Sequence, residues 1–159
     1  MPDYDVRPAG PADLPALSRL GALLVRTHHD FDRERFLAPG ADPERGYAAF
    51  LSAQLGREDS AIFVAERHGA ILGYVYTAIE PHSWKDLREA AGYVHDLAVD
   101  ESARRTGIAT ALMQAAIAWL RASGAPRVLL GTAYQNERAR RLFEALGFRP
   151  TMVEMTKEL

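Results

Sequence analysis

Residues 97 to 110 read Leu97-Ala98-Val99-Asp100-Glu101-Ser102-Ala103-Arg104-Arg105-Thr106-Gly107-Ile108-Ala109-Thr110. The apolar residues up to Val99 are typical of a strand, the polar residues after it indicate a loop, and the small residues from Gly107 begin a helix. The first amides of a helix have no carbonyl partner within it, and the helix dipole adds positive charge there. This junction therefore predicts an anion site, where Gly107 and Ala109 let a pyrophosphate approach the backbone and Arg104 and Arg105 add charge.

The pattern on either side of this stretch predicts a mixed α/β chain. In the first half of the chain, apolar spacing, caps and turn residues predict a strand at 4–7, a helix from 14, a helix from Pro43 after the N-cap Asp42, and a hairpin of 61–65 and 71–76. In the second half they predict a strand at 93–99, a helix from 107 to 124, a strand at 127–130, a helix at 136–146 and a final strand at 148–158. No repeat or linker interrupts this order, so we expect one domain over residues 1–159.

Composition narrows the class of function. The chain has 48% hydrophobic residues, 25% charged residues and a formal net charge of −2, as expected for a globular protein with a sizeable core. It has no cysteine, which excludes disulfides, thiolate metal sites and a cysteine nucleophile. The N-terminus does not read as a secretory signal and no apolar run is long enough to span a bilayer, so we expect a cytoplasmic protein without a membrane partner. Without a basic excess or a reading motif, we also expect no nucleic-acid partner.

Two motifs resemble the GCN5-related N-acetyltransferase (GNAT) superfamily. The first is Arg104-Arg105-Thr106-Gly107-Ile108-Ala109, similar to the family's Arg/Gln-x-x-Gly-x-Gly/Ala signature after its fourth strand. The second is the run 136–148, which begins Asn136-Glu137-Arg138-Ala139, continues to Leu142-Phe143-Glu144 and closes with Gly147-Phe148. Together with the order of elements, this likeness covers nearly the whole chain.

The resemblance implies a GNAT-like acyl-CoA N-acyltransferase fold, with a central mixed sheet of six to seven strands and about four helices. It further implies a bulge in the fourth strand, which splays from the fifth so that acetyl-CoA lies in the resulting V. No metal is required. By this analogy the residues that bind acetyl-CoA are Leu97, Ala98 and Val99 for the pantetheine arm, Arg104, Arg105, Thr106, Gly107, Ile108, Ala109 and Thr110 for the pyrophosphate, and Asn136 and Phe143 near the pantetheine and the sulfur.

Several residues are candidates for the proton acceptor that an attacking amine needs. His95 comes first, because its ordinary pKa lies near neutral pH and it precedes the acetyl-CoA segment on the same strand. Asp96, Tyr134 and Glu80 are the alternatives. The family tyrosine often assigned as general acid aligns with Phe143, which has no proton to give. The glutamate base of acetyltransferases that act on ribosomal-protein N-termini aligns with Gly131, which makes a protein N-terminus a weaker expectation.

The acceptor is expected to be a primary amine of a small molecule or a protein. His28, His29 and Phe31 belong to the region that forms the acceptor wall in similar proteins, and acidic residues there, with Glu80, can attract a cationic amine. A metal site at these adjacent histidines is disfavoured, because neighbouring residues on a helix point in different directions. Dimers are frequent among similar proteins, so a homodimer is compatible with this interpretation.

A second hypothesis is an acyl-CoA-binding sensor or interaction module with weak turnover, suggested by Phe143 and Gly131. Four aromatic residues are assigned to the hydrophobic core by default, namely Tyr47, Phe50, Trp119 and Phe148.

Overall fold

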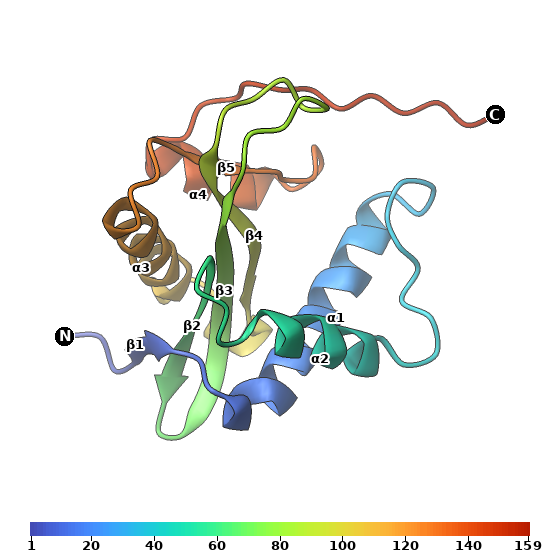
Figure 1. The fold of residues 1–159 in the computed structure, drawn as a ribbon. Helices are drawn as coiled ribbons and strands as arrows, with labels where there is room; N and C mark the ends of the chain where they lie inside the picture. The colour runs from blue at the N-terminus through green and yellow to red at the C-terminus, as the bar shows by residue number, and fades with distance from the viewer.

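The computed structural model describes all residues 1–159 and shows a five-stranded sheet with helices on both faces (Figure 1). The strands are β1 (Asp5–Pro8), β2 (Ser60–Arg67), β3 (Ala70–Glu80), β4 (Ala91–Val99) and β5 (Val128–Leu130). They follow one another in the sheet in chain order. All neighbours are antiparallel except β4 and β5, which are parallel and connected through a helix.

Four α-helices cover the sheet: α1 (Leu14–Phe31), α2 (Pro43–Gln54), α3 (Ile108–Ala122) and α4 (Glu137–Ala145). One starts at the predicted cap Asp42, and another is capped by Asn136, the residue at which the sequence predicts that helix to begin. The Asp42 side chain accepts from the amide of Arg45 at 3.0 Å, and Asn136 accepts from the amide of Ala139 at 3.1 Å. Each cap satisfies an amide that the first helical turn leaves without a carbonyl, so local sequence places both helix starts. None of the helices combines the length and the apolar composition that crossing a bilayer requires.

The sheet separates two hydrophobic clusters. Helices α1 and α2 contribute Leu17, Leu20 and Leu51 to one cluster, against residues of β2, β3 and β4. Helix α3 contributes Leu112 and Leu120 to the other, which also holds Phe143 of α4. A fully buried leucine contributes about 1.5–3 kcal/mol relative to an exposed one, so both faces of the sheet are firmly covered. The two helix layers therefore hold β4 in place from both sides.

The predicted strand at 148–158 does not form, and the sheet has five strands rather than six to seven. No backbone hydrogen bond involves residues 149–159, and each of them is exposed. Apolar residues such as Met152 and Met155 give this tail a strand-like composition, but a strand needs a neighbour and the tail leaves the sheet after α4 (Figure 1). An ion pair between Arg35 and Glu154 ties the tail to the segment after α1.

The expectation that Phe50 lies in the core is also wrong, because this residue is 44% exposed. Its ring packs against Tyr47 and Tyr76 at the surface of α2, with ring centroids 5.7 and 5.8 Å apart. Helical spacing indicated an inward position for Phe50, but α2 is amphipathic only over a narrow face, on which Leu51 is the buried residue.

Candidate active site

Strands β4 and β5 separate part of the way along the sheet. Their pairing covers three residues of each strand and ends at Val94 and Leu130. Beyond Val94 the edge of β4 that faces β5 has no partner strand, as the resemblance predicted for the fourth strand. Residues of β4 alternate between its two edges; the Asp100 amide donates to the Leu72 carbonyl beside β3, so it is Leu97 and Val99 that direct main-chain groups to the open edge, where they can pair with an extended ligand.

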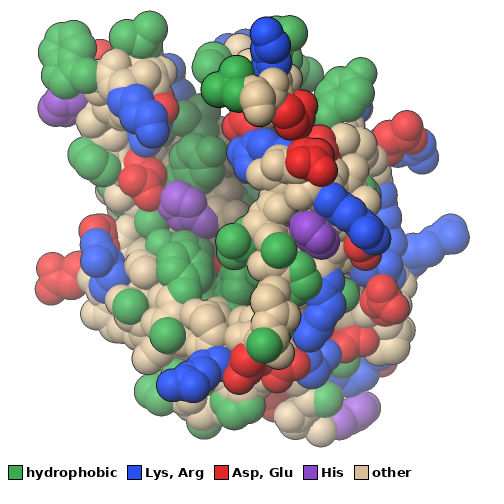
Figure 2. Space-filling view, turned by 90° about the vertical axis from the view of Figure 1, so that its right-hand side faces the viewer, with side chains coloured by type: hydrophobic (Ala, Val, Ile, Leu, Met, Phe, Trp, Pro, Cys, Tyr) green, Lys and Arg blue, Asp and Glu red, His purple; other side chains and the backbone are tan.

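A cavity of about 340 Å³ opens where the strands separate. Figure 2 shows a hollow in the surface, with a histidine and hydrophobic side chains gathered at its walls. The lining comes from α1, the segment that follows it, α2, β4, the end of β5 and α4, and comprises Leu24, Val25, His28, Phe36, Leu37, Tyr47, Val94, His95, Asp96, Leu97, Leu130, Gly131, Thr132, Asn136, Ala139 and Phe143.

A β-bulge in β4 brings two candidate catalytic residues to this cavity. Tyr76 of β3 pairs with Asp96 and Thr77 pairs with Val94, so His95 is the extra residue of β4. A bulge redirects side chains that strict alternation would send to opposite faces of the sheet. Both His95 and Asp96 consequently line the cavity.

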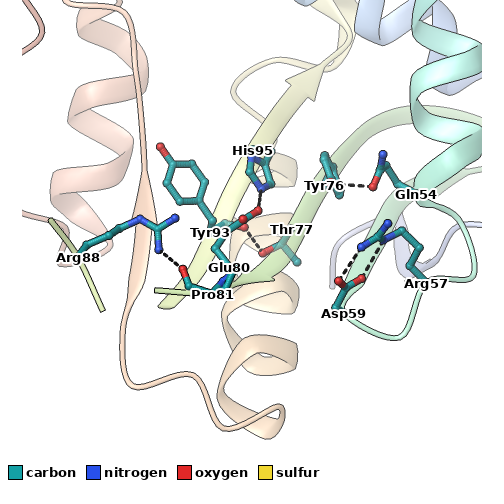
Figure 3. A network of polar contacts seen from close by, with 10 residues as sticks. All are labelled: Gln54, Arg57, Asp59, Tyr76, Thr77, Glu80, Pro81, Arg88, Tyr93 and His95. Atoms are coloured by element: carbon teal, nitrogen blue, oxygen red, sulfur yellow. Dashed lines mark hydrogen bonds and ion pairs between the residues drawn. The ribbon is translucent and has the colours of Figure 1, made fainter. Parts of the chain in front are cut away.

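The imidazole of His95 is held by an acidic residue and two aromatic rings (Figure 3). Its Nε2 lies 2.7 Å from Oε1 of Glu80, and its ring stacks between Tyr76 and Tyr93, with centroids at 5.0 and 4.7 Å. A carboxylate next to Nε2 favours the proton on that nitrogen, which leaves Nδ1 as the basic atom of the neutral ring. Glu80 itself does not line the cavity, and its carboxylate contacts the imidazole of His95.

The carboxylate of Asp96 is held by two tyrosines. The hydroxyls of Tyr47 and Tyr74 both donate to Oδ2, at 3.1 and 2.9 Å. Burial raises the pKa of Asp96 above its ordinary value, and these hydrogen bonds oppose that shift. Burial and the nearby Asp96 charge raise the pKa of both tyrosines, which therefore remain protonated donors at neutral pH.

The loop between β4 and α3 has the geometry of an anion site. The backbone of Arg105 and of Gly107 is left-handed, with φ of 64° and 86°, and this turns the chain into α3. The first hydrogen bond of the helix joins the amide of Ala111 to the carbonyl of Gly107 at 3.0 Å. The six amides of residues 105–110 donate to no atom of the protein. Successive free amides at a helix start are the donors that a phosphate group needs.

The loop is braced on its other side by Asp100. This side chain accepts from the amide of Ser102 at 3.0 Å and pairs with Arg19 of α1 at 2.7 Å. The hydrogen bonds from Ser102 and Arg19 lower the pKa of Asp100 to about 2. The carboxylate is therefore charged at neutral pH and links the loop to α1.

The other predicted site residues divide into two groups. His28, Asn136 and Phe143 line the cavity. His28 contacts the Leu24 carbonyl through Nδ1 at 2.8 Å, and Phe143 is 8% exposed. The structure does not bring His29, Phe31 or Tyr134 to this cavity.

The second group lies around the cavity without lining it. The ring of Phe31 packs edge-on against His28 at 5.9 Å, and Nδ1 of His29 lies 3.4 Å from the Phe36 carbonyl. Tyr134 is 81% exposed, and the guanidinium of Arg140 lies 5.2 Å from its ring centroid. An exposed tyrosine outside the cavity is poorly placed to exchange a proton with a ligand inside it.

Two tyrosines of this site could not be identified from the sequence. Tyr47 is assigned to the core, and Tyr74 is placed in the predicted strand at 71–76 without a role of its own. Only the tertiary packing of α2 beside α1 and the sheet brings their hydroxyls together on Asp96. The tyrosine hydroxyls were the one feature of the sequence that pointed to a buried polar partner, because a buried tyrosine hydroxyl usually has a hydrogen-bond partner. Within the chain, no three or more His, Asp or Glu side chains lie close enough to hold a metal ion.

Comparison with known proteins gives consistent matches. The model of the acetyltransferase (GNAT) family matches residues 24–148. A mycothiol acetyltransferase of Parafrankia sp. (strain EAN1pec) is 32% identical over 93% of this chain and 53% of that protein. An N-alpha-acetyltransferase of Sulfurisphaera tokodaii is 34% identical over 70% of each chain. The chain thus spans about half the length of the first of these relatives.

The fold is also that of solved structures. The aminoglycoside N-acetyltransferase AAC(6')-Iy, solved in complex with CoA, superimposes with a TM-score of 0.76. This match covers 98% of the present chain and 94% of the other, at 20% sequence identity. At that identity the likeness concerns the fold.

Proposed function

The chain belongs to the GNAT family of acetyltransferases, and from this premise we propose that it transfers the acetyl group of acetyl-CoA directly to a primary amine. The observation that carries the proposal is the open edge of β4, which leads into the six free amides of residues 105–110. Both features are main-chain donors and acceptors that the protein itself leaves unused. A ligand with an extended polar arm and a diphosphate, as in acetyl-CoA, satisfies both.

In this proposal each part of acetyl-CoA has its own partners. The pantetheine arm pairs with the stretch Leu97, Ala98 and Val99, and Asn136 and Phe143 line the same cavity. The diphosphate binds to the amides from Arg105 to Thr110, with the side chains of Arg104 and Arg105 adding positive charge. Thr106 is already engaged, because its hydroxyl donates to the Ala103 carbonyl at 2.6 Å, so its contribution is the backbone amide.

Acetyl transfer follows from placing an amine beside the thioester in the cavity. The amine nitrogen attacks the carbonyl carbon, the carbon–sulfur bond breaks, and CoA leaves as the thiolate. Holding the two reactants at attack distance supplies much of the rate advantage, and an unpaired β4 amide stabilises the negative charge on the carbonyl oxygen. No acyl-enzyme is needed, which agrees with the absence of cysteine from the chain.

His95 is the proposed proton acceptor. The Glu80 contact at Nε2 directs the basic Nδ1 away from that carboxylate, and the flanking tyrosine rings fix the plane of the imidazole. Asp96 remains the alternative, since it lies next to His95 in the same cavity. The departing thiolate needs no tyrosine acid, because the ordinary thiol pKa of about 8.5 makes a thiolate a tolerable leaving group near neutral pH. Phe143 is therefore compatible with turnover.

The acceptor is an amine of a small molecule or a protein. The names of the two curated relatives, mycothiol acetyltransferase and N-alpha-acetyltransferase, show that related proteins include members with different acceptors. The second candidate function is an acyl-CoA-binding module with weak turnover, which the hydroxyl-free Phe143 favours.

A transfer assay separates the two functions. The purified chain is incubated with acetyl-CoA and a library of primary amines, and released CoA is measured with a thiol reagent while mass spectrometry detects acetylated products. Because the protein has no cysteine, it contributes no thiol background. CoA release above hydrolysis together with an acetylated amine supports the enzyme. Tight CoA binding with no acetylated product supports the module, and the absence of CoA binding refutes both.

A further inference from the structure

Asp96 provides one carboxylate oxygen that the protein does not use. Both tyrosine hydroxyls donate to Oδ2, whereas Oδ1 accepts no hydrogen bond. The only buried side-chain nitrogen or oxygen without a partner is Nε of Arg67. The free Oδ1 of Asp96 is therefore accessible, and Asp96 is a lining residue of the cavity.

Asp96 shares the cavity with two imidazoles, those of His28 and His95. It is the only acidic residue in the lining, and the lining contains no lysine or arginine. The side chains around it are largely apolar or aromatic, including His28, Phe36 and Tyr47. A carboxylate in such surroundings attracts a cation more strongly than an exposed carboxylate does, and aromatic faces add to that attraction.

Packing of α2 on α1 fixes the tyrosine that holds Asp96. A Cβ atom added at Gly21 would lie 2.0 Å from Cδ1 of Tyr47, so the tyrosine ring packs directly on the backbone of α1. Tyr74 is fully buried in β3. The two hydroxyls thus reach Asp96 from two rigid elements, and they determine which of its oxygens remains free.

We propose that Oδ1 of Asp96 binds the protonated amino group of the acceptor, and that Tyr47 is a positioning residue that keeps this oxygen available. The acceptor class is then a primary amine that carries a positive charge at neutral pH. This inference rests on the proposed acetyl transfer. It concerns binding alone, since the ammonium group keeps all its bonds at this stage and gives up a proton only before attack.

Steady-state kinetics of Asp96→Asn test the proposal. With an amine that the wild-type protein acetylates, KM for the amine should rise 30-fold or more, while the Kd for CoA stays within twofold. Asp59→Asn is the matched control, because it removes the same charge from an exposed residue paired with Arg57 outside the cavity. A variant in which kcat falls but KM is unchanged would overturn the proposal, since Asp96 would then act in proton transfer and not in binding.

Two further variants examine the positioning residue. Tyr47→Phe removes one donor to Oδ2, and Gly21→Ala cannot be accommodated unless Tyr47 moves. Both should raise KM for the amine by about the same factor, smaller than that of Asp96→Asn, with CoA binding unchanged. If Tyr47→Phe leaves KM at the wild-type value, Tyr47 has no positioning role.

A binding measurement keeps this inference separate from the proposed function. The CoA-bound protein is titrated with phenethylammonium chloride or with the neutral 2-phenylethanol while protein NMR shifts are recorded. Saturable shifts with the ammonium compound, lost in Asp96→Asn, are expected even if no amine is acetylated. Equal responses to the charged and the neutral probe would refute the ammonium site, whatever the outcome of the transfer assay.

Discussion

Gly107→Val is expected to weaken CoA binding strongly while it lowers stability only modestly. Gly107 has φ of 86°, a conformation in which a residue with a Cβ atom costs about 1–2 kcal/mol. The only atom within 4 Å of the added Cβ would be the Tyr4 hydroxyl at 3.4 Å, an ordinary contact, so the strain comes from the backbone conformation. A loop that relaxes to negative φ redirects the amides of residues 105–110. Each lost hydrogen bond to a charged phosphate costs about 1.5–3 kcal/mol, which weakens the Kd by roughly 10- to 150-fold.

Gly124→Val provides the matched control. Gly124 follows α3 at its opposite end, has φ of 84° and would place a Cβ atom in open space. Both variants should therefore lose similar stability, and 1–2 kcal/mol corresponds to a fall of about 2–8 °C in Tm for a chain of this size. Calorimetric titration with CoA, at a temperature where both variants are folded, should show wild-type affinity for Gly124→Val alone. Equal CoA affinity in the two variants would refute the phosphate site at this loop.

Three other substitutions have defined outcomes. His95→Ala should lower kcat by about 10²- to 10⁴-fold with CoA affinity unchanged. If the pH–rate profile of this variant is the same as that of the wild type, the proton acceptor is Asp96 or solvent. Asp100→Asn should cost about 1–2 kcal/mol at pH 7 after allowance for solvent screening of its pair with Arg19. The pKa of Asp100 is about 2 in the folded protein and 3.8 ordinarily, so the difference in unfolding free energy between the wild type and Asp100→Asn should vanish as the pH falls from 4 to 2. Urea unfolding at several pH values measures this difference. A difference that does not change with pH would show that ionisation of Asp100 does not contribute to stability. Asp96→Asn should unfold at or above the wild-type Tm at pH 7. Burial raises the pKa of Asp96 in the folded protein, so keeping this carboxylate ionised above pH 4 lowers the stability of the wild type. A large fall in the Tm of the variant would contradict this reasoning.

Features set by neighbours in the chain could be predicted from the sequence. The cap at Asp42, the start of a helix at Asn136 and the loop before α3 depend on contacts within a few residues, and each lies where the sequence predicts it. The bulge in the fourth strand was implied by the resemblance alone. The prediction of a terminal strand at 148–158 is wrong. Apolar composition shows only that a segment favours an extended conformation, and a strand forms only where it can pair with the edge of another strand.

The amino-acid sequence by itself determined the order of elements, the helix starts and the position of the amide-rich loop, because each depends on short-range spacing and backbone conformation. The tertiary structure alone decided that His95 and Asp96 share one cavity and that the Glu80 carboxylate contacts the imidazole. It also decided that Tyr47 and Tyr74 donate to the same oxygen of Asp96. These contacts join residues up to 49 positions apart. They depend on strand register and on how closely α2 approaches α1 at Gly21, which no local pattern encodes.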